Sequence, residues 1–87
     1  MMNFKQKELS AMLFSSLKNQ YPEIELVNIT ESPEDPNDLW INIVMPEDED
    51  REIECRELSS EISMDILLDY GYHITISPAP RKAKIAA

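Results

Sequence analysis

The chain has 87 residues, of which 43% are hydrophobic and 29% are charged, and its formal net charge is −9. This balance is typical of one small globular domain and excludes a disordered chain, and no apolar run is long enough to span a membrane. The single cysteine, Cys55, cannot form an internal disulfide, and the first residues lead into no apolar signal segment. We therefore expect a cytoplasmic protein.

The charge is unevenly placed along the chain. Residues 31–69 carry fourteen acidic side chains but only two basic ones, Arg51 and Arg56. Such a segment repels phosphate backbones, which argues against a nucleic-acid partner. Two interpretations remain: the acidity keeps the protein soluble, or it complements a protein partner with a basic surface.

The first part of the chain predicts a helix and then a strand. Residues 4–20 have leucines and aromatic residues at helical spacing, and Pro22 ends the helix. Branched residues on both faces of residues 24–29 predict a strand that is mostly buried or contains a bulge. Residues 31–37 are rich in proline and acidic residues and predict an exposed connection. The apolar stripe of the helix consists of Leu9, Met12, Leu13, Phe14, Leu17 and Tyr21.

Residues 39–45 form the clearest strand pattern. Leu39, Ile41, Ile43 and Met45 share one face, while Trp40, Asn42 and Val44 share the other. Because the second face is also largely apolar, this strand is predicted to be central. It should pair with residues 24–30 as an antiparallel hairpin.

A second helix is predicted after Pro46. The four carboxylates of residues 47–50 suit a helix N-terminus, where Asp48 or Asp50 can cap the free N–H groups. A calcium loop is the weaker interpretation of these acids, because such a loop needs a turn glycine. The buried stripe is predicted to be Cys55, Leu58, Ile62 and Ile66, extended by Leu67 and Leu68. Gly71, the only glycine, should end the helix in a left-handed conformation.

Residues 72–77 alternate apolar and polar side chains, which predicts a third strand. Residues 81–87 have no core pattern, and we expect them to be a basic disordered tail. The order is therefore α-β-β-α-β, an α+β domain over residues 1–80 with two helices packed on one face of a small three-stranded sheet.

Residues 37–48 resemble the second core strand of minimal nucleotidyltransferases of the polymerase-β superfamily. Residues 56–78 resemble the helix and strand that follow, through Gly71 with its preceding tyrosine and through the stop at Ser77 and Pro78. The resemblance covers about half of the chain. It implies a nucleotidyltransferase-like core.

The chemistry of that family needs a Gly-Ser turn and two aspartates that hold divalent metal ions. Asp38 occupies the first aspartate position, but Trp40 occupies the second, and no glycine occurs before Gly71. An indole cannot bind a hard cation, and Asn42 on the same face is a poor substitute for a carboxylate. The resemblance therefore implies a retained scaffold without catalytic residues, cofactor or metal.

Four residues are candidates for a binding site: Thr30, Asp38, Trp40 and Asn42. Trp40 is either the anchor of a binding face or a core residue. Cys55 lies on the apolar helix stripe and His73 on the polar face of its strand, so we interpret them as a structural cysteine and a solvated histidine.

The leading hypothesis is a non-catalytic protein-binding module, because members of the resembled family are often encoded beside small partner proteins. One alternative is an atypical magnesium-dependent nucleotide-binding or nucleotidyl-transfer protein that uses Asp38. Another is a structural subunit that associates with itself through a sheet edge or Trp40.

Overall fold

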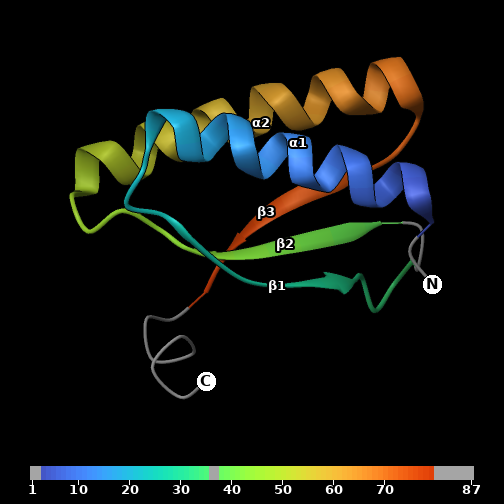
Figure 1. Ribbon diagram of the computed structural model, residues 1–87, viewed down its shortest axis with the longest axis horizontal. Coiled ribbons are helices and arrows are strands. Elements are labelled where there is room, and N and C mark those ends of the chain that lie inside the picture. Colours follow the sequence, from blue (N-terminus) through green and yellow to red (C-terminus); the bar gives the residue numbers. More distant parts are fainter. Residues whose placement is uncertain (1–2, 36–37, 80–87) are drawn as a thin grey trace.

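The computed structural model describes residues 3–35 and 38–79, and it confirms the predicted α+β class and element order. Two helices lie side by side over one face of a three-stranded sheet (Figure 1). The expected basic tail, residues 81–87, lies outside the described residues. The elements are α1 (Phe4–Gln20), β1 (Glu25–Glu31), β2 (Leu39–Val44), α2 (Glu49–Tyr70) and β3 (Ile74–Pro78).

The sheet has the order β1-β2-β3, so β2 is central as predicted. β1 and β2 pair antiparallel, and the expected irregularity is a bulge between Leu26 and Asn28. β3 pairs parallel to β2, with Leu39 opposite Ile74. A parallel pair needs a crossover connection, and α2 provides it.

The core lies between the sheet and the helices. Leu39, Ile41 and Ile43 of β2 are at most 1% exposed, and they point toward the helical layer as the alternation predicts. The buried cluster also contains Leu9, Leu13, Leu17, Tyr21, Ile24, Met45, Cys55, Ile66 and Ile74. This packing fixes β2 and β3 beneath the helices.

The helix ends follow the expected rules. Asp48 caps α2 by accepting a hydrogen bond from the Arg51 N–H at 3.0 Å. Gly71 ends α2 with a φ of 77°, and its N–H donates to the Leu67 carbonyl. The acidic run before α2 is therefore a helix start, as the sequence indicates.

Two predicted core positions are wrong. Leu68 is 75% exposed and Met12 is 45% exposed. Leu68 lies about 200° around the helix from the buried Ile66, so it points away from the sheet. Met12 lies about 100° from the buried Leu13, at the margin of the α1 stripe. Each helix buries a narrower face than the apolar pattern indicates.

Candidate functional site

The alternation of β2 places the candidate residues from the sequence on the sheet face that the helices leave open. The Asn42 amide donates to the Asn28 Oδ1 at 2.7 Å and to the Thr30 Oγ1 at 3.1 Å. Thr30 lies opposite Trp40 in the register of β1 and β2. Trp40 is 40% exposed, so the interpretation of Trp40 as a core residue is wrong.

Asp38 also belongs to this face, through a contact that the sequence did not predict. Its Oδ2 lies 3.4 Å from the Nδ1 of His73, a distance at which protonated histidine forms an ion pair. The two residues immediately precede Leu39 and Ile74, which are opposite each other in the parallel register. The proximity follows from the parallel pairing of β3 with β2, which the strand patterns alone do not specify.

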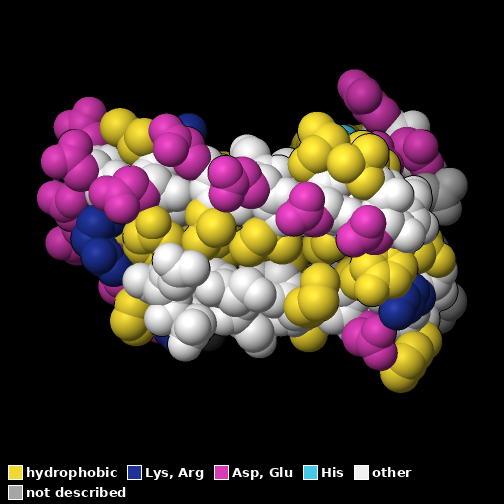
Figure 2. Space-filling view, turned by 90° about the horizontal axis from the view of Figure 1, so that it is seen from above, with side chains coloured by type: hydrophobic (Ala, Val, Ile, Leu, Met, Phe, Trp, Pro, Cys, Tyr) yellow, Lys and Arg dark blue, Asp and Glu magenta, His cyan; other side chains and the backbone are white. Residues whose placement is uncertain are grey.

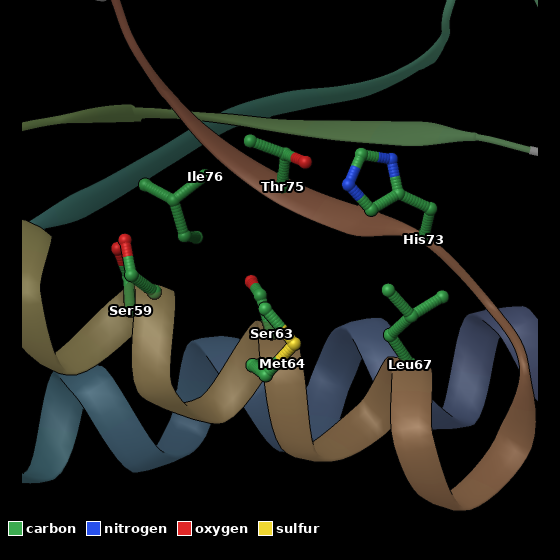
Figure 3. Close-up of a pocket in the computed structure, with 8 residues that line it drawn as sticks. Ser59, Ser63, Met64, Leu67, His73, Thr75 and Ile76 are labelled. Atoms are coloured by element: carbon green, nitrogen blue, oxygen red, sulfur yellow. The ribbon is translucent and has the colours of Figure 1, made fainter.

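A groove runs between α2 and β3 at the β3 edge of the sheet (Figure 3). Its main cavity has a volume of about 250 Å³. A second hollow of about 180 Å³ shares Ser59, Ser60 and Ile76 with it, and extends the groove toward Pro78. The main cavity is lined by Ser59, Ser60, Ser63, Met64, Leu67, His73, Thr75 and Ile76. We refer to both hollows together as the α2–β3 groove.

The floor of the groove includes the free edge of β3. The Leu39 N–H donates to the His73 carbonyl, and the Ala79 N–H donates to the Ile43 carbonyl. Alternate residues of a strand direct their backbone N–H and carbonyl groups to opposite sides, so these groups of Ile74 and Ile76 point away from β2. The Ile74 carbonyl accepts a hydrogen bond from the Ser63 hydroxyl at 2.6 Å.

The crest of α2 carries a row of carboxylates that we call the acidic ridge: Asp50, Glu54, Glu57, Glu61 and Asp65. The spacing of three and four residues places them on one side of the helix, and all five are exposed. Acidic side chains run along the helical layer in Figure 2. Within residues 3–35 and 38–79, none of the five forms an ion pair.

The ridge is connected to the groove. Ser60 and Met64 line the groove, and together with Glu61 and Asp65 they also line a shallow hollow on the crest of α2. Met64 is 54% exposed, and Leu68 follows it one turn later on the same side of the helix. Acidic and apolar side chains are therefore presented together beside an open strand.

Neither Ser63 nor Cys55 is placed to act as a nucleophile. The Ser63 hydroxyl donates to a backbone carbonyl rather than to His73, so the imidazole does not activate it. Cys55 is fully buried, and burial raises the pKa of its thiol, which suits the structural role expected from the sequence.

In the described part of the chain, no group of three or more His, Cys, Asp or Glu side chains has a geometry that could hold a metal ion. Neither of the two described helices combines the length and the apolar character needed to cross a bilayer.

The sequence did not identify the groove. A usable signal was present in α2, where Ser59 and Ser63 are four residues apart and interrupt the apolar stripe on the side that faces β3. Recognising it required knowing that β3 lies at an edge of the sheet with α2 beside it.

No family model, curated protein or solved structure matches this chain. The resemblance to nucleotidyltransferases therefore stays a prediction from the sequence.

Proposed function

We propose that the chain is a non-catalytic protein-binding module on a nucleotidyltransferase-like scaffold, and that its partner presents basic side chains. One observation carries the proposal: no carboxylate of the acidic ridge forms an ion pair within the described chain, and the ridge lies beside exposed Met64 and Leu68. Charged side chains of one sign steer and select an oppositely charged partner, while exposed apolar side chains supply affinity when they become buried.

The non-catalytic part of the proposal is supported by the residues at the positions where the resembled family holds its metals. Trp40 stands where the second aspartate would be, and Asn42 is occupied by hydrogen bonds across the sheet. An indole and an engaged amide offer no hard anionic ligand to a magnesium ion.

The test is affinity capture with the purified protein and a pair of matched variants. Glu61→Gln/Asp65→Asn removes two charges from the ridge, and Glu34→Gln/Glu49→Gln removes two charges elsewhere. We expect native protein and control to retain the same partner, identified by mass spectrometry and carrying an exposed basic segment, and the ridge variant to lose it. Equal retention by all three proteins, or a strictly monomeric protein that retains no partner, would contradict the proposal.

A second candidate function is magnesium-dependent nucleotide binding, and the observation that favours it is the grouping of Thr30, Asp38 and Asn42 on an open face. An amide NMR titration with magnesium and nucleoside triphosphates tests it. Shifts centred on these residues and weakened by Asp38→Ala would support nucleotide binding. An unchanged spectrum would exclude it.

A further inference from the structure

The two edges of the sheet differ in how well they are protected from pairing with another chain. The edge formed by β1 contains the bulge at Leu26 and Asn28 and carries Glu25 and Glu31, and bulges and charges both discourage strand pairing. The β3 edge has neither device along Ile74–Ser77, where it pairs with β2 in regular parallel register. An incoming strand would therefore meet less resistance at β3.

The backbone of Ile76 is available at this edge. Its N–H and carbonyl point away from β2, and no hydrogen bond within the described chain uses them. Ser63 already satisfies the Ile74 carbonyl, and Pro78 lacks an N–H, so the pairing site is short. It can accommodate an extended segment of about five residues.

The groove beside this edge suits the side chains of an added strand. A strand next to β3 would lie about 4.8 Å from it and direct every second side chain toward α2. There it would meet Met64 and Leu67 together with the serine hydroxyls of α2 (Figure 3). Long basic side chains from the same segment could extend over Met64 to Glu61 and Asp65, which line the adjoining hollow.

We infer that the α2–β3 groove binds an extended, basic segment of the partner protein, which adds to β3 as a fourth strand of the sheet. This inference rests on the proposed function and specifies the partner and the mode of binding. Charge complementarity to the acidic ridge identifies a basic occupant, and the open main-chain groups of Ile76 select an extended segment over a helical one, because a helix has no main-chain groups left to pair.

The test begins with a displayed library of random ten-residue peptides, selected against the whole protein and then synthesised. We expect basic peptides whose affinity depends on alternate backbone N–H groups. N-methylation at every second position should weaken binding roughly tenfold or more, and N-methylation at the intervening positions should change it less than about twofold. N-methylation preserves side chains and charge, so this comparison isolates the main-chain hydrogen bonds.

A matched pair of protein variants places the binding at β3. Ile76→Pro removes the outward N–H without removing a bond to β2, and Ile29→Pro makes the same change at the β1 edge, where Ile29 lies between the bonded positions of the hairpin. We expect only Ile76→Pro to abolish peptide binding, with folding of both variants verified by circular dichroism. If either variant unfolds, the N-methylated peptides decide the question on the native protein.

Several outcomes would overturn the inference. Binding that tolerates N-methylation at both sets of positions but is lost in Glu61→Gln/Asp65→Asn would exclude strand addition and leave the proposed function intact. A selection that enriches no peptide would also exclude it.

Two further outcomes would assign the groove to this chain itself. A dimer in sedimentation that Ile76→Pro dissociates would identify a second copy as the occupant. Tenfold stronger peptide binding after removal of residues 81–87 would identify the chain's own basic segment.

Discussion

Ser10 is a buried polar residue in α1 whose hydroxyl has no hydrogen-bond partner within the described chain. Burying an unpaired hydroxyl costs about 1 to 3 kcal/mol, and alanine is also a better helix former than serine. We therefore predict that Ser10→Ala raises the free energy of unfolding in urea denaturation. Ser15→Ala on the exposed side of α1 is the control, because it changes helix propensity alone. The gain in the free energy of unfolding from Ser10→Ala should exceed the gain from Ser15→Ala by roughly 1 kcal/mol. Equal gains would show that the Ser10 hydroxyl is solvated.

Among the described residues, Gly71 alone has a positive φ, a backbone conformation that restricts which residue can stand there. A Cβ built at this position meets no atom within 4 Å, so any cost of substitution comes from the φ of 77° rather than from a clash. We predict that Gly71→Ala lowers the free energy of unfolding by about 1 kcal/mol, and that Gly71→Asn costs less because asparagine tolerates the left-handed region. Chemical denaturation of the three proteins measures this order. An alanine variant as stable as the native protein would contradict it.

At the scale of elements, one ion pair joins the start of α2 to the turn between α1 and β1. The guanidinium of Arg51 donates to both carboxylate oxygens of Glu23, with an Nη2–Oε1 distance of 3.0 Å, and it lies 5.0 Å from the centre of the Tyr21 ring. The hydrogen bonds from Arg51 lower the pKa of Glu23 below its ordinary value of 4.5. The pair thus makes the junction between these elements sensitive to acid.

The direction in which stability changes with pH follows from the coupling between folding and proton binding at Glu23. A carboxylate whose pKa is lowered by folding contributes stability that is complete above its unfolded pKa, near 4.5, and is lost as the pH falls through the lower folded value. We predict that Arg51→Met is less stable than the native protein at neutral pH, and that the difference shrinks between about pH 5 and pH 3. Urea denaturation at several pH values measures it.

Arg56→Met is the control for the acid effect. Arg56 pairs with Glu52, one turn away on the same helix, so this ion pair does not connect two elements of the fold. We expect this control to lose less stability than Arg51→Met at neutral pH. A difference between Arg51→Met and the native protein that stays constant as the pH falls would contradict the role assigned to Glu23.

The helices and strands could be predicted from local sequence patterns. Predicting the groove would have required the arrangement of these elements in space. The alternation of β2 and the position of Gly71 are local signals, and both predictions are confirmed. The Asn3–Gln6 capping box at the start of α1 is another local signal. By contrast, the pairing of Asp38 with His73 depends on parallel register between segments far apart in the chain, and no local pattern encodes it.

At the scale of the whole molecule, the net charge is −9, and five of the seventeen acidic side chains lie on one helix crest. Within the ridge, Glu57, Glu61 and Asp65 follow one another at intervals of four residues, and like charges at this spacing destabilise a helix by about 0.2 to 0.5 kcal/mol per pair. The isolated protein therefore carries a cost that a basic partner would remove. Salt screens the same repulsion, so the native protein should become more stable as ionic strength rises.

Replacing Glu61 tests this cost, because Glu61 belongs to two of the repulsive pairs. We predict that Glu61→Gln raises the free energy of unfolding by roughly 0.5 kcal/mol at about 10 mM salt, and by much less at about 0.5 M, where screening has already removed the repulsion. Glu34→Gln, in the connection before β2, changes the net charge equally without relieving a helical pair, and should have little effect. If Glu61→Gln gave no gain at low salt, the ridge would carry no cost in the isolated protein, and relief of its repulsion could not contribute to the binding of a basic partner.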